Sequence, residues 1–311
     1  VIAGATDPAK FNLTAPKGKI LVAQGGNLVL SSKPAGHQDH DADGTGEIPT
    51  GKEWIAWNGT TQMDTAGYYY LDKGITLTST IKVTADVHLC LNGYSITAPE
   101  KGGASTMFKI EKSGKLSVCD CQEGGRIEML RDGSNNMAIQ VMSRRTFDLY
   151  SGTIYAAGSS RAVYSNGGTV NVSGGIIESP STINGALRAD GKDAVVNLSG
   201  GEIKGRVQLR TGAKLYLSNA PTLSYVDIKA INTAYPIQIH AASKDKTAPY
   251  TGDAIEISTV ETNLEPGHIV VYNVNENNDE LFTLKDNRIV RDGDRPPDSL
   301  PHTHPFRPFQ T

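Results

Sequence analysis

Short segments in the middle of the chain alternate hydrophobic and polar residues and then break at a glycine-containing corner. Val170–Ile177 reads Val-Asn-Val-Ser-Gly-Gly-Ile-Ile, and Val196–Ile203 repeats it as Val-Asn-Leu-Ser-Gly-Gly-Glu-Ile. A looser copy begins at Phe147 and a degenerate copy at Leu215. The four starts, at residues 147, 170, 196 and 215, are 23, 26 and 19 residues apart. This spacing indicates a repeat whose loops vary in length while its strands stack.

Each copy has the period of two that is typical of a short strand on either side of a bend. A third apolar pair precedes each copy, for example Ala162–Val163 and Ala186–Leu187, so one unit contains about three strands. Three short strands and three corners in one repeat describe a coil of a parallel β-helix, in which equivalent strands of successive coils pair. The pattern therefore predicts an all-β fold, a single-stranded parallel β-helix.

The predicted β-helix covers residues 57–291, since weaker copies at Leu89–Ile96 and Leu116–Ile127 extend the pattern upstream. Residues 1–56 are expected to form an N-terminal cap or small β module, with two strands and an Asp/Gly-rich loop. A cap is favoured because an open β-helix end is an unpaired sheet edge. Residues 292–311 read as a Pro-rich linker or tail, beyond which we expect further domains of a longer modular protein. A β-sandwich stays open for the ends.

Composition and charge limit the classes of partner that we expect the chain to bind. Glycine is frequent, at 33 of 311 residues, which fits a chain with many corners. The 30 basic and 33 acidic residues nearly balance, so no nucleic acid partner is expected. The sequence has no run of about 18 apolar residues, so we expect no membrane insertion. Three cysteines fit either three thiols or one disulfide, from Cys90 to Cys119 or Cys121, and thiols beside the core are the favoured interpretation.

One polar loop has the residue types of a metal site. Its carboxylates and Gly44 match the first half of a calcium-binding loop, but Thr50 stands where the bidentate glutamate of such a loop belongs. Two histidines in an H-x-x-H pair offer ligands for a transition metal such as zinc. The alternative is a plain solvated acidic loop. We therefore expect no required cofactor, and calcium is the one candidate cofactor that we consider. The candidate ligands are Asp39, Asp41, Asp43, Glu47, His37 and His40.

Several motifs in a fixed order resemble a known family. They are Trp57–Thr60, Ala66–Leu71, Leu89–Ile96 and Cys119–Ile127, followed by the Ser-Gly-Gly-x-Ile corners. Together they resemble the secreted right-handed parallel β-helix surface proteins of Gram-positive anaerobic bacteria. The resemblance, over about residues 54–290, implies a right-handed helix of the pectate-lyase-like superfamily and a secreted or cell-surface location. It supplies no catalytic residues.

An enzyme on this fold would need carboxylates and basic residues in a groove on the side of the coil stack. The outward candidates are Asp148, Glu178, Asp190, Asp193, Glu202 and Arg188. Because they follow no paired motif, we interpret them as solvated surface residues. Sugar rings stack on aromatic faces, which makes Trp54, Trp57, Tyr150, Tyr164 and Tyr216 candidate ligand-binding residues. The repeated Asn171 and Asn197 predict a short polar ladder.

The sequence thus predicts a noncatalytic secreted or cell-surface module that binds a glycan or a host surface molecule, as an adhesin does. This function rests partly on the resemblance, because a fold alone does not fix a function. One alternative is a polysaccharide lyase or glycoside hydrolase acting in a groove on the flank. A second alternative is a structural spacer that projects another domain.

Overall fold

The fold is seen in a computed structural model of the chain. It describes residues 2–3, 19–24, 27–32, 37, 40 and 51–223, and shorter segments at 225–229, 237–240, 244–245, 247, 251, 255–259, 269–272, 282–285 and 288–291. The chain divides into two compact units, Val1–Gln38 and Asp39–Thr311. All regular structure in these ranges is β-strand. They contain no helix with the length and apolar character of a membrane span.

The first unit contains a three-stranded antiparallel sheet. Its order is β1 (Ile2–Ala3), β3 (Asn27–Ser32) and β2 (Lys19–Gln24). In the longer pair, Leu21 lies opposite Leu30 and Val22 lies opposite Val29. Both longer strands lie within residues 1–56, for which two strands are predicted.

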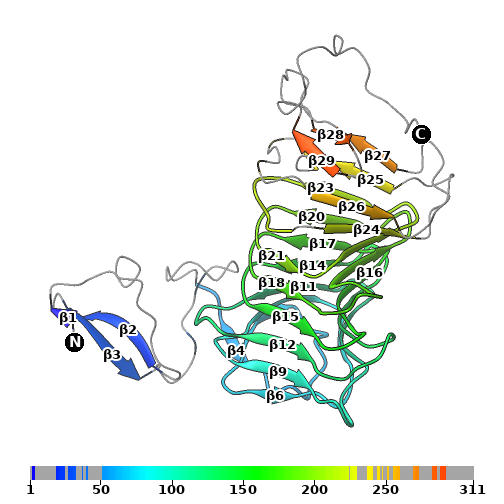
Figure 1. Ribbon diagram of the computed structural model, residues 1–311. Helices are drawn as coiled ribbons and strands as arrows, with labels where there is room; N and C mark the ends of the chain where they lie inside the picture. Colours follow the sequence, from blue (N-terminus) through cyan, green and yellow to red (C-terminus); the bar gives the residue numbers. More distant parts are fainter. Residues whose placement is uncertain are drawn as a thin grey trace. The chain divides into compact units, whose positions relative to one another are not determined.

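The second unit is a stack of coils whose strands form three sheets (Figure 1). Sheet I contains the first strand of each coil, sheet II the second and sheet III the third. The parallel strands of sheet I are β7 (Ile81–Val83), β10 (Thr106–Ile110), β13 (Met137–Val141), β16 (Arg161–Asn166), β19 (Leu187–Asp190), β22 (Val207–Arg210), β24 (Tyr225–Lys229) and β26 (Ile255–Thr259). The predicted all-β parallel β-helix is therefore confirmed.

Sheets II and III complete the coils. Sheet II consists of β4 (Trp54–Ala56), β5 (Gly67–Tyr70), β8 (Asp86–Cys90), β11 (Lys115–Cys119), β14 (Thr146–Leu149), β17 (Thr169–Val172), β20 (Val195–Leu198), β23 (Lys214–Leu217), β25 (Ile237–His240) and β27 (Ile269–Tyr272). Sheet III consists of β6 (Ile75–Thr76), β9 (Ser95–Ala98), β12 (Arg126–Met129), β15 (Thr153–Ala156), β18 (Ile176–Glu178) and β21 (Glu202–Lys204). Strands of successive coils pair in parallel throughout both sheets.

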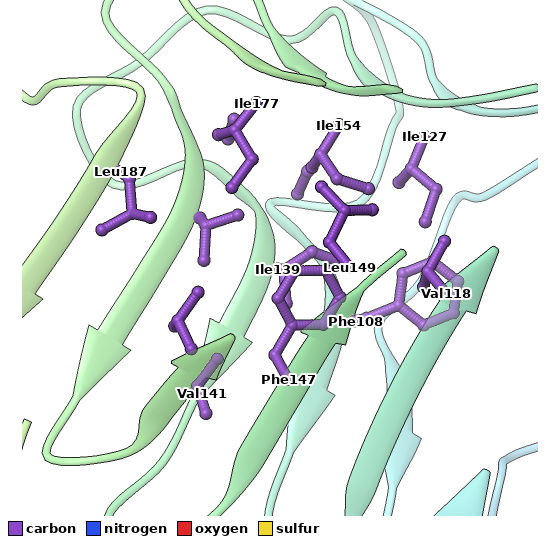
Figure 2. Close-up of a cluster of buried hydrophobic side chains, with 14 of the residues drawn as sticks. Phe108, Val118, Ile127, Ile139, Val141, Phe147, Leu149, Ile154, Ile177 and Leu187 are labelled. Atoms are coloured by element: carbon purple, nitrogen blue, oxygen red, sulfur yellow. The ribbon is translucent and has the colours of Figure 1, made fainter. Parts of the chain in front are cut away.

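The core consists of side chains that stack from coil to coil. In sheet III the register places Ile127 beside Ile154 and Ile154 beside Ile177, and all three are fully buried. Figure 2 shows these isoleucines in a line, with Phe108 and Phe147 packed in the same interior. β-branched side chains suit this arrangement because they fill the spacing between adjacent strands on a pleated surface.

The Ser-Gly-Gly corners exist because the backbone has no room for a side chain there. Gly175 and Gly201 have φ angles of 71° and 72°, in the left-handed region that favours glycine. A Cβ atom on Gly201 would lie 2.8 Å from the carbonyl oxygens of both Gly174 and Gly175 in the preceding coil. The repeated glycine therefore lets one corner stack directly on the next.

The last strands depart from parallel stacking. β28 (Phe282–Lys285) and β29 (Arg288–Arg291) pair with each other in antiparallel orientation, and β29 pairs with β26 in the same way. Leu284 and Ile289, which lie within the predicted range of the β-helix, thus belong to an antiparallel extension of sheet I.

Candidate functional site

One outward position of sheet II lines up through nine successive strands, and we call these side chains the outer row. Each member faces the equivalent residue of the next coil in the strand register. The row consists of Trp54, Tyr68, His88, Ser117, Asp148, Asn171, Asn197, Tyr216 and His240. Because side chains alternate across a strand, the apolar neighbours of the row from β8 to β23 point into the core.

The middle of the outer row is a continuous hydrogen-bonded chain. Asp148, which is 5% exposed, accepts hydrogen bonds from Ser117 Oγ at 3.2 Å and from Asn171 Nδ2 at 2.6 Å. Asn197 Nδ2 donates in turn to Asn171 Oδ1 at 2.6 Å, which confirms the predicted asparagine ladder. Lys115 Nζ lies 2.9 Å from Asp148 Oδ2. Asp148 therefore organises the row.

The ion pair with Asp148 also favours the protonated form of Lys115. Burial of Lys115 disfavours its charged form, but the hydrogen bond and the negative charge of Asp148 outweigh this effect and raise the pKa of Lys115. The Lys115 ammonium group therefore stays paired with the Asp148 carboxylate. Asp148, proposed from sequence as a catalytic candidate, has its oxygens occupied by these donors.

The two ends of the outer row are aromatic. The rings of Tyr68 and His88 stack at 4.5 Å with an interplanar angle of 8°, and Trp54 meets Tyr68 edge-on at 5.3 Å. At the other end, Tyr216 and His240 stack at 4.1 Å with an angle of 14°. Burial lowers the pKa of His88, which favours its neutral ring. These contacts hold the rings in fixed positions along the sheet.

An open groove of about 610 Å³ lies over the outer row where its amides meet its second aromatic end. Its lining combines one aromatic ring with amides, hydroxyls and one charge of each sign. The lining residues are Asn171, Asn197, Ser199, Tyr216, Ser218, Lys244 and Asp245. Within the described part of the chain, Asn197 Oδ1 is buried and has no hydrogen-bond partner. A polar group bound in the groove would satisfy this acceptor.

A second polar cluster lies on the outer face of sheet I, in three consecutive coils. The ring of Tyr164 has the Arg161 guanidinium at 5.2 Å and the Arg188 guanidinium at 5.5 Å from its centroid. Asp190 Oδ2 pairs with Arg188 Nη2 at 3.0 Å and with Arg210 Nη1 at 3.2 Å. Two guanidinium groups thus share one carboxylate and the third lies against the Tyr164 ring. We call Arg161, Tyr164, Arg188, Asp190 and Arg210 the arginine cluster.

Burial sets the electrostatics of the arginine cluster. Arg161 is 8% exposed and donates to Asn184 Oδ1 at 2.9 Å. Its burial lowers its pKa, and the nearby charge of Arg188 lowers it further. The cluster carries a formal excess of two positive charges, which suits an anionic ligand.

The other catalytic candidates lie apart from one another. Glu178 and Glu202 are on sheet III, where Glu178 lies 3.9 Å from Arg126 and Glu202 lies 3.3 Å from Lys204. Asp193 is exposed in the corner after β19. Of the six candidates, Arg188 and Asp190 are brought into direct contact. The carboxylates are therefore spread over three sheets.

The candidate ligand-binding aromatics have different environments. Trp57 is 2% exposed, and its ring lies 5.8 Å from Phe108, so the expectation that it contacts a ligand is corrected and it is a core residue. Tyr150 is half-buried directly after β14. Tyr164 lies in the arginine cluster, Tyr216 lines the groove, and Trp54 begins the outer row.

The candidate metal ligands divide between described and undescribed residues. Asp39, Asp41, Asp43 and Glu47 lie outside the described residues, so the calcium loop stays a prediction. His40 is buried, and its ring lies 4.6 Å from that of Trp54. The three cysteines of the chain, all in its described part, form no disulfide.

Two of these cysteines lie close together. Cys90 Sγ and Cys121 Sγ are 3.4 Å apart, at the ends of two adjacent coils. Burial raises the pKa of the Cys90 thiol well above its usual range. In the absence of a cation this thiol is therefore protonated near neutral pH.

Several residues of these sites were not singled out from the sequence. Tyr68, His88, Ser117 and His240 occupy the outer row position in coils that lack the Val-Asn-Val frame. The signal that could have found them is the single polar or aromatic residue between two apolar residues in each strand of sheet II. Arg210 pairs with Asp190 from the next coil, a contact that depends on strand register.

Comparison with known proteins gives no relative: no protein-family model, no curated protein and no solved structure matches the chain.

Proposed function

We propose that the protein is a noncatalytic binding module, secreted or on the cell surface, whose sheet II binds a glycan in the manner of an adhesin. The observation that carries the proposal is the groove over Asn171, Asn197 and Tyr216, with its aromatic ring and its buried acceptor. Its lining is chemically complementary to a sugar, since a pyranose ring has an apolar face and a rim of hydroxyl groups.

The chemistry of the lining supports a carbohydrate more than an apolar ligand. An aromatic face offers the apolar surface on which a sugar ring stacks, and amides and hydroxyls both donate and accept hydrogen bonds. Lys244 and Asp245 add one donor and one acceptor that carry charge. Specific pockets fix a ligand's orientation with a few such polar groups.

The regular spacing of the outer row supports a ligand built of linked units, such as an oligosaccharide. Adjacent strands of a sheet are about 4.8 Å apart, a spacing on the scale of one sugar ring. Asn171, Asn197 and Tyr216 occupy three successive strands in register. Consecutive sugars of an oligosaccharide can therefore meet consecutive coils.

The test is retention of plant, microbial and host glycans on the immobilised full chain, with and without calcium. Tyr216→Ala should weaken binding of a retained glycan about 2- to 10-fold, the loss of one ring contact. Tyr155→Ala is the matched control, because Tyr155 is an outward tyrosine of sheet III. Equal affinities of the wild type and Tyr216→Ala would contradict the proposal, and no retention at all would favour the spacer.

The arginine cluster favours a second candidate, a polysaccharide lyase or glycoside hydrolase that acts on an acidic glycan. Arg188 and Asp190 are a basic and an acidic group in contact on one flank. New reducing ends or unsaturated products, lost on Asp190→Ala, would establish this activity and overturn the noncatalytic proposal. Retention without products would support binding alone.

A further inference from the structure

We propose that His40, Cys90 and Cys121 bind a zinc ion. This inference is independent of glycan binding, since it concerns the opposite end of sheet II from the groove. One ligand atom from each of His40, Cys90 and Cys121 lies within 4.8 Å of the other two.

Strand register brings the two sulfur atoms together. Cys90 ends β8 and faces Cys119 at the end of β11, and Cys121 follows in the next corner. The separation of 3.4 Å between Cys90 Sγ and Cys121 Sγ is far longer than the ~2.05 Å bond of a disulfide. Two thiolates at 2.3 Å from a tetrahedral zinc ion would be about 3.8 Å apart. The pair is therefore spaced for a shared ion.

His40 supplies the third ligand from a fixed position. Its side chain is 4% exposed, and its ring lies 4.6 Å from the ring of Trp54. Trp54 is itself held by the edge-on contact with Tyr68 in the next strand. A buried imidazole with a packed face is pre-oriented, as ligands of structural metal sites are.

Three protein ligands leave the fourth position of a tetrahedral zinc ion to a water molecule. His37 belongs to the other compact unit and stays a predicted ligand. Two thiolates and one imidazole form a Cys₂His set, which suits zinc and not the oxygen-seeking calcium ion. Both thiols release their protons when the ion binds. The ion would join His40 to the coils of β8 and β11.

The experiment uses the full chain, purified under reducing conditions and stripped of metal, and titrates it with Co²⁺ as a spectroscopic substitute for Zn²⁺. We expect one Co²⁺ per chain, with thiolate-to-cobalt absorption in the near ultraviolet and the visible bands of a tetrahedral ion. One equivalent of Zn²⁺ should abolish these bands. Cys121→Ala should lose most of the thiolate absorption, and Cys121 is partly exposed, so the coil should still fold. Folding is checked by circular dichroism.

Matched variants separate the ligands from their neighbours. Cys119→Ala is the control, because Cys119 is a buried thiol beside Cys90 that lies outside the cluster. It should keep the full spectrum, while His40→Ala should keep thiolate absorption and bind Co²⁺ at least tenfold more weakly. Absence of thiolate bands in the reduced wild type would overturn the proposal. An unchanged spectrum in Cys121→Ala would also overturn the proposal. A Cys90–Cys121 disulfide that forms in air despite saturating Zn²⁺ would do the same.

Discussion

At the scale of single residues, Asp148 accepts most of the hydrogen bonds that link side chains of the outer row. It is buried, and it receives Lys115, Ser117 and Asn171 at once. Removing a buried acceptor leaves its donors unsatisfied, which costs more than the bonds contributed. The polar chain across the middle of sheet II therefore depends on this one carboxylate.

We expect Asp148→Ala to lower the free energy of unfolding by about 1.5–3 kcal/mol, the range for hydrogen bonds to a charged group. Asp148→Asn should cost less, because the amide keeps an acceptor for Asn171. Asp193→Ala is the control, since Asp193 is exposed, and it should change stability by less than about 0.5 kcal/mol. Urea unfolding measures all three, and a similar loss in Asp148→Ala and Asp193→Ala would contradict the role of Asp148.

Glu111 gives a prediction for pH dependence. Its hydrogen bond to Lys109, at 2.9 Å, lowers the pKa of Glu111 below its usual value. A carboxylate with a lowered folded-state pKa stabilises the fold above its unfolded pKa of about 4.3, and this contribution disappears as the pH falls through the folded value. The contribution itself is small, roughly 0.2–1 kcal/mol for a surface pair.

Glu111→Gln should therefore be less stable than the wild type at pH 7, and this difference should be smaller at pH 3. The measurement compares urea midpoints of the two proteins at both values, with Glu100→Gln as a control at an exposed position. A stability difference that persists unchanged at pH 3 would show that the ion pair is not its source.

At the scale of the coil, the corner glycines set how closely coils stack. Gly201 and Gly191 both have positive φ angles, 72° and 95°, but the space around them differs. A Cβ atom on Gly201 would meet two carbonyl oxygens at 2.8 Å, whereas one on Gly191 would have nothing within 4 Å. Comparing the two positions separates backbone strain from steric overlap.

Gly191→Ala should cost about 1–2 kcal/mol from the left-handed conformation alone. Gly201→Ala should cost a further 1–3 kcal/mol or so, because the corner must move away from the coil below. Thermal or urea unfolding measures both variants. Equal losses would mean that corner contact between coils does not limit the stack.

The sequence predicts the coils well where its frame is regular. Val170–Val172 and Val196–Leu198 lie in β17 and β20 as expected, because alternation and glycine corners are local properties. The sites were predicted less well because they combine residues from different coils and loops of unequal length. Cys90 and Cys121 meet only once strand register is fixed, and Trp57 packs against Phe108, a contact that the local pattern does not contain.

At the scale of the whole molecule, the zinc proposal makes a prediction about stability. An ion that binds only the folded chain stabilises it by about 2.7 kcal/mol at a concentration 100 times its dissociation constant. Adding a strong chelator should therefore lower the melting temperature of the wild type and leave Cys121→Ala unaffected. A chelator effect of the same size in both proteins would place the responsible ion elsewhere.

The groove over Asn171, Asn197 and Tyr216 is the glycan site that we propose on sheet II. The most direct measurement is a crystal structure of the full chain with the glycan that is best retained. We expect a sugar ring stacked on Tyr216, with a hydroxyl group donating to Asn197 Oδ1. A glycan bound at the arginine cluster, or anywhere else with the groove empty, would contradict it.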